Sequence, residues 1–201
     1  ARIQTRQSLA ALAPLGIDVE TLAEVARNMA AAREALERQT KHAAGEILRI
    51  EGGAVVMQAE AFFAEPEEIR RHLMIRALGS ISGSAYPPRR SPVAALIAGL
   101  ETGQAATLDG CQALLRRGEI WVFREYNAVR DLRVPADQLW DGRWRATPPD
   151  RLSEGTELRA LGAEGLAQCP DWRSLRRPRA MLLSTPAIWQ GECLLAAPLA
   201  G

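Results

Sequence analysis

Apolar residues at helical spacing dominate the first half of the chain. Residues 1–12 predict a short helix, which Pro14 and Gly16 interrupt. Asp18 is a suitable N-cap for a long second helix that runs to about Arg49. One stripe of that helix carries the apolar residues Val19, Leu22, Val25, Ala26 and Met29.

Three further breaks divide the rest of this half. Gly52 and Gly53 end the long helix, and residues 54–63 predict a short strand with a connection. A third helix begins at Pro66, because proline favours a first helical turn and acidic residues follow it. Its buried stripe consists of Ile69, Leu73, Ala77 and Leu78. A loop over 79–88 then leads to a fourth helix over 92–100.

After Gly103 the spacing changes to that of strands. Residues 105–115 and 119–126 predict two strands joined by a hairpin at Arg116-Arg117-Gly118. Asp141-Gly142 is a second turn signal, of the kind that suits tight hairpins, and Pro148-Pro149 predicts a linker. The remaining expected strands cover residues 156–161, 179–185 and 191–197. The chain therefore predicts an α+β fold, with a helical domain over 18–104 followed by a strand-rich α+β domain over 105–201.

Composition narrows the class of protein. The 201 residues are 47% hydrophobic and 24% charged with a formal net charge of +1, which is typical of a globular protein. No apolar run approaches the ~18 residues of a membrane span, and no leader with a cleavage site opens the chain. The cysteines Cys111, Cys169 and Cys193 are odd in number and form no metal-binding or disulfide pattern. We expect a cytoplasmic protein that does not bind membranes.

Lys41 is the only lysine among 25 basic residues. A codon bias toward GC-rich arginine codons explains this by itself. Arginine is also the better bidentate ligand for phosphate, so the bias suits an RNA partner. Because the net charge is close to zero, any such partner must meet a local patch.

Catalytic signatures are missing from the sequence. Neither the phosphate-binding loops of nucleotide enzymes nor the nucleophile and zinc motifs of hydrolases occur. His42 and His72 lie in predicted helices without partners at metal-ligand spacing, and Glu67-Glu68 is explained by helix capping. We therefore predict no catalytic residue, no metal site and no cofactor site in this chain.

The arginines carry more information. Between Pro66 and Arg124 there are eight arginines and five acidic residues, a surplus of three positive charges. Arg89 and Arg90 follow Pro87-Pro88, which stiffens the chain directly before the fourth helix. Such a set can follow a phosphate backbone, or it can be an ordinary solvated surface.

A second arginine cluster and five tryptophans lie in the second half. The cluster consists of Arg173, Arg176, Arg177 and Arg179. Tryptophans can stack on bases, but on strands of a small domain they belong more often to the core. We expect a core position for Trp121, Trp140, Trp144, Trp172 and Trp189.

The order of these pieces resembles a known family. The run from Arg70 to Glu125, RRHLMIRALGSISGSAYPPRRSPVAALIAGLETGQAATLDGCQALLRRGEIWVFRE, places a helix with arginines before a Pro-Arg corner, an apolar helix and two strands. The later segments LWDGRW and PAIWQGECLLAAPLAG follow the same order. Together they resemble the C-terminal region of the tRNA(Ile)-lysidine synthases in their shorter, Arg-rich form.

The N-terminal residues are similar to the arginine-alternating helix RxRxRxxLLPxL that follows the catalytic domain in this family. Arg2 and Arg6 match its outer arginines, whereas Gln4 and Ala10 replace its middle arginine and its proline. The resemblance implies that residues 1–17 are the end of that linker helix. It also implies that the catalytic domain, with its Ser-Gly-Gly-x-Asp-Ser loop, ATP and Mg²⁺, is missing from this chain.

The family is an ATP-dependent carbon–nitrogen ligase that attaches lysine to C2 of the first-anticodon cytidine of a minor isoleucine tRNA. The resemblance implies that this chain binds and orients the body and acceptor stem of that tRNA, and it suggests a homodimer. On that basis the expected tRNA-binding residues are Arg2, Arg6, Arg70, Arg71, Arg76, Arg89, Arg90, Arg116, Arg117 and Arg124.

Two other functions stay open at this point. The same arginines could pair with acidic surfaces in a non-catalytic protein-interaction module. An enzyme with a pocket in the strand-rich half is the third reading, although no nucleophile and base are evident. RNA binding that falls steeply with salt separates the first function from both alternatives.

Overall fold

The structure is a computed structural model that describes residues 4, 9, 11–146 and 155–201 of the chain. It divides into two compact units, residues 1–44 and 45–201. A 3₁₀ turn at Ala13–Leu15 and most of helix α2 (Val19–Ile47) lie in the first unit. The predicted first helix and the Pro148-Pro149 linker fall largely outside the described residues.

Helix α2 begins as the sequence predicts. The backbone N–H of Thr21 donates to Asp18 Oδ1 at 2.8 Å, and this hydrogen bond lowers the pKa of the Asp18 carboxyl. The apolar stripe of the helix is exposed in its N-terminal part, with Val19, Val25 and Met29 at least half accessible. The hydrogen bond from Thr21 confirms Asp18 as the predicted N-cap.

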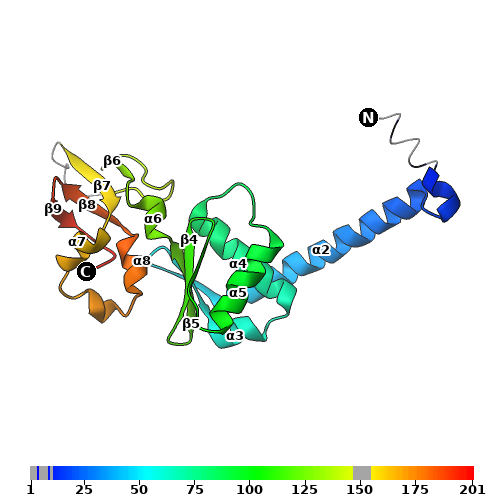
Figure 1. Cartoon of the computed structure of the whole chain (residues 1–201), viewed down its shortest axis with the longest axis horizontal. Helices are drawn as coiled ribbons and strands as arrows, with labels where there is room; N and C mark the ends of the chain where they lie inside the picture. The colour runs from blue at the N-terminus through cyan, green and yellow to red at the C-terminus, as the bar shows by residue number, and fades with distance from the viewer. Residues whose placement is uncertain (1–3, 5–8, 10, 147–154) are drawn as a thin grey trace. The chain divides into compact units, whose positions relative to one another are not determined.

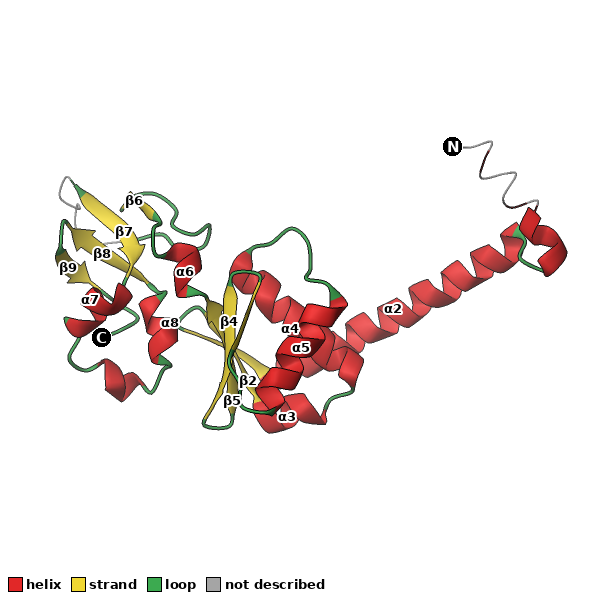
Figure 2. Ribbon diagram, viewed as in Figure 1, coloured by secondary structure: helices red, strands yellow, loops and turns green. Residues whose placement is uncertain are grey.

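A five-stranded antiparallel sheet and its helices form the first part of the second unit (Figures 1 and 2). Its strands follow the order β1-β2-β5-β4-β3. They are β1 (Leu48–Glu51), β2 (Ala54–Gln58), β3 (Ala106–Leu108), β4 (Cys111–Arg116) and β5 (Glu119–Arg124). The helices are α3 (Ala59–Ala64), α4 (Glu67–Ser82) and α5 (Arg90–Glu101).

The two central strands are buried on both faces, which explains their continuous apolar sequences AVVM and IWVF. Helices α4 and α5 contact one face, and helix α8 (Arg179–Leu183) lies on the other (Figure 1). The face toward α8 holds the cluster Ala54, Val56, Trp121, Phe123 and Met181. Helix α5 presents its apolar stripe with a regular i, i+3, i+4, i+7 spacing at Val93, Leu96, Ile97 and Leu100.

A second antiparallel sheet, in the order β6-β7-β8-β9, completes this unit. Its strands are β6 (Arg133–Pro135), β7 (Thr156–Ala160), β8 (Pro186–Gln190) and β9 (Cys193–Ala196). Around them lie α6 (Tyr126–Val129), α7 (Gly162–Ala167) and a 3₁₀ turn at Trp172–Leu175. Trp140 and Leu158 belong to one hydrophobic cluster of this part, and Trp189 and Leu182 belong to a second.

The α+β prediction is confirmed, since a helical N-terminal part is followed by a strand-rich C-terminal part. The five-stranded sheet takes strands from both sides of residue 104, where the sequence analysis places a domain boundary. As a division of function, the boundaries at 17/18 and 104/105 stay predictions.

Four predicted elements differ from the structure. Helix α2 ends at Ile47, and Gly52 and Gly53 form the β1–β2 turn instead, with φ of 55° and 83°. The loop expected over 79–88 begins later, because α4 continues to Ser82. A turn at Asp109-Gly110, where both φ angles are positive, splits the strand expected over 105–115 into β3 and β4.

The strand expected over 179–185 is helix α8, and the strand lies just after it, at β8. Arg, Ala, Met and Leu are all strong helix formers, and Pro178 precedes them at the N-cap. A short apolar run does not distinguish a buried helical turn from a strand, so the pattern alone was insufficient here.

Gly53→Ala is expected to lower the free energy of unfolding by about 1–3 kcal/mol through overpacking. A Cβ at this position would lie 2.2 Å from Trp144 Cζ2, on a backbone whose φ is +83°. Gly118→Ala is the matched control, because its φ is +78° and nothing lies within 4 Å of the added Cβ. Chemical denaturation gives the free energy of unfolding of both variants. Equal losses of stability would contradict a clash between the added Cβ and Trp144.

Candidate nucleic-acid interface

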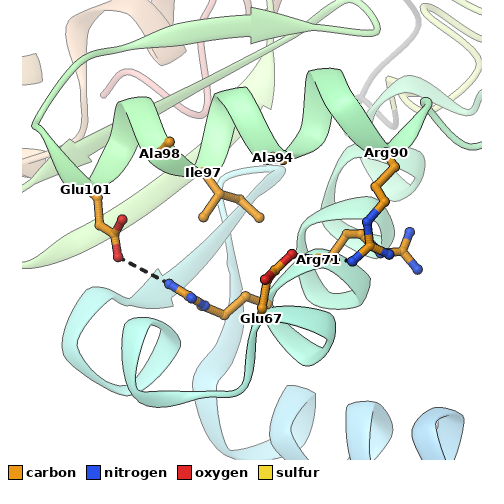
Figure 3. Close-up of a pocket in the computed structure, with 8 residues that line it drawn as sticks. Glu67, Arg71, Arg90, Ala94, Ile97, Ala98 and Glu101 are labelled. Atoms are coloured by element: carbon orange, nitrogen blue, oxygen red, sulfur yellow. Dashed lines mark hydrogen bonds and ion pairs between the residues drawn. The ribbon is translucent and has the colours of Figure 1, made fainter.

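A groove of about 190 Å³ runs along α4 and α5 (Figure 3). Three of the predicted arginines line it, and Ala94, Ile97 and Ala98 of α5 give it an apolar wall. The arginines are Arg70, Arg71 and Arg90, and the acidic residues among the lining are Glu67 and Glu101. The fold thus brings together residues that lie up to 34 positions apart in the sequence.

Glu68 is the centre of the ion pairs beside this groove. Arg71 Nε donates to both of its carboxylate oxygens at 3.1 Å, and Arg90 Nη1 donates to Oε2 at 2.9 Å. The hydrogen bond from Arg71, together with the charge of Arg90, lowers the pKa of Glu68 to about 2. His72 Nε2 lies 3.3 Å from the same carboxylate.

Each of the three arginines in the groove is paired with a carboxylate. Arg70 Nη1 donates to Glu101 Oε1 at 3.2 Å and so connects α4 with α5, and Arg90 Nη2 lies 3.3 Å from Glu67 Oε1. Arg70 Nε is buried and has no hydrogen-bond partner among the described residues. A phosphate entering the groove must therefore exchange places with a carboxylate, which lowers the affinity that these arginines can provide.

Glu68→Gln is expected to remove part of the stability of the fold at neutral pH and to flatten its loss in acid. The pKa of Glu68 lies below its ordinary value of 4.5, so the ionised carboxylate stabilises the folded state above that pH. This contribution is lost as the pH falls toward about 2. Unfolding measured from neutral to acidic pH tests this.

Glu67→Gln is the control for that experiment, because its side chain is 76% exposed and it contacts Arg90 only at 3.3 Å. It should leave the acid dependence nearly unchanged. The assignment of Glu68 would be wrong if both variants followed the same curve.

Three other predicted arginines are exposed and unpaired within the described part of the chain. Arg76 lies on α4, Arg89 is the N-cap residue of α5, and Arg117 occupies the β4–β5 turn with a φ of 52°. Pro87 and Pro88 fix the chain directly before Arg89, and Arg89 itself is held as the N-cap of α5, while its side chain is accessible. These side chains are available to a ligand without breaking an ion pair.

The last two described arginines of the predicted set support the fold. Arg116 Nη1 donates to the Arg177 carbonyl oxygen at 2.5 Å. Arg124 Nε donates to both carboxylate oxygens of Asp141 at 3.1 Å, and its Nη1 donates to the Gly110 carbonyl oxygen at 3.0 Å. Arg2 and Arg6 lie outside the described residues.

The second arginine cluster, residues 173–179, also contains both paired and exposed arginines. Arg177 Nε donates to Glu51 Oε1 at 3.2 Å and its Nη1 donates to the Leu199 carbonyl oxygen at 2.9 Å. The guanidinium carbon of Arg173 lies 4.6 Å from the centre of the Trp172 ring. Arg176 and Arg179 are exposed.

Three of the five tryptophans lie in the core as expected, and the other two pack against it. The exposed fractions are 3% for Trp121, 0% for Trp140 and 2% for Trp189, and Trp144 and Trp172 are half-buried. The three buried rings are therefore not available to stack on bases.

The described residues contain no cluster of three or more metal-binding side chains. No helix within the described ranges is both long enough and apolar enough to span a membrane. Burial raises the pKa of the Cys111 thiol to about 12, which makes it unreactive at neutral pH.

The acidic partners in the groove were missed by the sequence analysis, which explained Glu67-Glu68 by capping alone. The spacing of Glu68 to Arg71 and His72, at i+3 and i+4, is a signal for pairing along a helix. No local signal connects Glu68 with Arg90, because the two residues meet only when α4 packs on α5.

The chain is similar to a known protein along its whole length. The chain is 48% identical over 200 residues to the tRNA(Ile)-lysidine synthase of Ruegeria pomeroyi, and the match covers 100% of this chain and 47% of that protein. It falls in the C-terminal part of the relative, so the resemblance expected from the sequence is confirmed. The chain spans about half the length of the curated relative that it matches. No family model matches the chain.

Proposed function

We propose that this chain is the tRNA-recognition part of a tRNA(Ile)-lysidine synthase. The observation that carries the proposal is the 48% identity to such an enzyme along the whole of the chain. In this proposal the complete protein is a ligase that uses ATP to attach lysine to the first-anticodon cytidine of a minor isoleucine tRNA. ATP, Mg²⁺ and lysine are handled outside this chain, which holds the tRNA body and acceptor stem.

The distribution of arginines supports this role. Arg76, Arg89 and Arg117 are exposed on three different elements and have no partner within the described residues. Proteins recognise helical RNA mainly by its shape and through its phosphates and 2′-hydroxyls. A protein that binds RNA in this way needs separated cations more than side chains that contact base edges. Arg89 is held between Pro87-Pro88 and the start of α5, so less backbone freedom is lost when it binds a phosphate.

The paired arginines of the groove supply a second, conditional set of contacts. Arg71 and Arg90 share Glu68, and Arg70 is held by Glu101. An RNA backbone that displaces these carboxylates gains charge-assisted hydrogen bonds but loses the existing ion pairs. We therefore expect the three unpaired arginines to contribute more to affinity than the three paired arginines.

A competition experiment separates this function from protein interaction. The chain is bound to fluorescently labelled tRNA at low salt, and unlabelled tRNA or polyglutamate of equal total charge is added. Displacement by tRNA at much lower concentration than by polyglutamate is the result that the proposal requires. Equal displacement would mean that the arginines recognise only negative charge and would favour an acidic protein partner.

A further inference from the structure

A hollow of about 200 Å³ is lined by residues of α6, α7 and strands β6, β7 and β8 of the second sheet. It is remote in sequence from the α4–α5 groove. Six of the lining residues have side chains with polar atoms: Tyr126, Arg130, Arg133, Arg159, Glu164 and Trp189. Three arginines and one glutamate leave this lining with a positive surplus.

Arg159 is a buried charge with little compensation. Its exposed fraction is 8%, and its guanidinium lies 4.1 Å from the centre of the Trp189 ring. Its Nη2 donates to the Gly191 carbonyl oxygen at 3.0 Å. The carboxylate of Glu192 is 3.6 Å away, but that side chain is 82% exposed. Such a pair with a solvated carboxylate compensates only weakly for the burial of the cation.

Arg133 places a second cation beside it. Arg133 and Arg159 are directly opposite each other in the β6–β7 register. Like charges at opposite positions of an antiparallel pair destabilise it. The carboxylate oxygen of Glu157 nearest to Arg133 is 3.9 Å away, and the two side chains are 42% and 56% exposed. An anion between the two arginines would replace this repulsion by attraction.

Arg130 adds a third cation to the lining, and the ring of Trp189 forms part of its wall. Arg130 Nε lies 3.2 Å from Asp131 Oδ2, an ion pair in which the two side chains are 56% and 88% exposed. The indole N–H of Trp189 is buried and has no acceptor among the described residues. A buried donor without an acceptor costs free energy, and it is the kind of group that a bound ligand satisfies.

We propose that this hollow binds a phosphate group between Arg130, Arg133 and Arg159. Guanidinium forks match the geometry of phosphate oxygens, and three of them suit a dianion better than a single carboxylate. The group comes from the end of a nucleic acid chain or from a free phosphate compound. This inference does not depend on tRNA binding by the α4–α5 region.

The test titrates the whole chain with inorganic phosphate at constant ionic strength and follows the assigned indole N–H resonance of Trp189. A saturable shift of that resonance is expected. In the double variant Arg130→Gln/Arg133→Gln the dissociation constant should rise by about tenfold or more, since two charge-assisted contacts are lost. Both side chains are more than half exposed, so this variant retains the fold.

Arg173→Gln/Arg179→Gln is the matched control, because it removes the same charge from exposed residues outside the hollow. It should bind phosphate as the unchanged chain does. Absence of a saturable shift, or equal weakening in both double variants, overturns the proposal.

A second arm identifies the source of the phosphate. Two RNA oligonucleotides of one sequence are compared, one with a 5′-phosphate and one with a 5′-hydroxyl. A preference for the phosphorylated end that disappears in Arg130→Gln/Arg133→Gln assigns the site to a nucleic acid terminus. Equal binding of both, with inorganic phosphate still bound, assigns it to a free phosphate compound and equally supports the site.

Discussion

Arg124→Gln is expected to lower the free energy of unfolding by about 3–5 kcal/mol. This is the usual loss when one partner of a buried ion pair is removed and the other charge stays buried. Arg124 and Asp141 have side chains that are only 19% and 8% exposed. Arg124 also holds the Gly110 carbonyl oxygen in the turn between β3 and β4. The substitution leaves the Asp141 carboxylate with a weaker partner inside the fold.

A substitution of Asp141 tests whether the Arg124–Asp141 ion pair causes this loss of stability. Asp141 has a φ of 49°, and asparagine tolerates that conformation, so Asp141→Asn removes the charge without straining the turn. The double variant Arg124→Gln/Asp141→Asn should lose less stability than the two single losses added together, with a difference of about 0.5–3 kcal/mol.

Arg117→Gln is the control for the same series. Its side chain is exposed and unpaired in the part of the chain that the structure describes, so its effect should stay within about 0.5 kcal/mol. Denaturant unfolding gives all four values. A loss below about 0.5 kcal/mol for Arg124→Gln would return this arginine to the set that is free to bind RNA.

The second large effect concerns RNA. The triple variant Arg76→Gln/Arg89→Gln/Arg117→Gln is expected to weaken tRNA binding and to reduce its salt dependence by up to about 3 phosphate contacts. The physical reason is that each unpaired arginine releases counterions from one phosphate without first breaking an ion pair. Binding curves at several salt concentrations give the slope directly.

A charge-matched variant on α2 controls for long-range electrostatics. Arg27→Gln/Arg33→Gln/Arg38→Gln removes the same formal charge, and Arg33 and Arg38 are exposed residues paired along the helix. Its salt slope should change by less than about 1 contact. If the two triple variants weaken binding equally, net charge and not the identified arginines determines the affinity.

Elements with a complete local signal could be predicted from the sequence. Asp18 accepts the capping hydrogen bond, and the spacing of Val93, Leu96, Ile97 and Leu100 gives α5 its buried face. Strand β1 was missed because LRIE follows α2 without a break and contains two charged residues. Helix α8 was mistaken for a strand because an apolar run of its length fits both.

The candidate site was less predictable, because its chemistry depends on pairing across long sequence separations. Arg124 meets Asp141 over 17 positions, and Arg177 meets Glu51 over 126 positions. In the sequence alone, nothing distinguishes Arg124 and Arg177 from the unpaired Arg89 and Arg117. The sequence shows where cations occur, but tertiary packing decides which of them are already neutralised.

The most direct test of the proposed function is a titration of this chain with a minor isoleucine tRNA and with an unrelated tRNA, each at low and at physiological salt. We expect binding that weakens steeply as salt increases, because contacts between arginines and phosphates release counterions. A preference for the isoleucine tRNA would show that the chain also discriminates between tRNA bodies. Absence of binding to either tRNA at low salt would contradict the account.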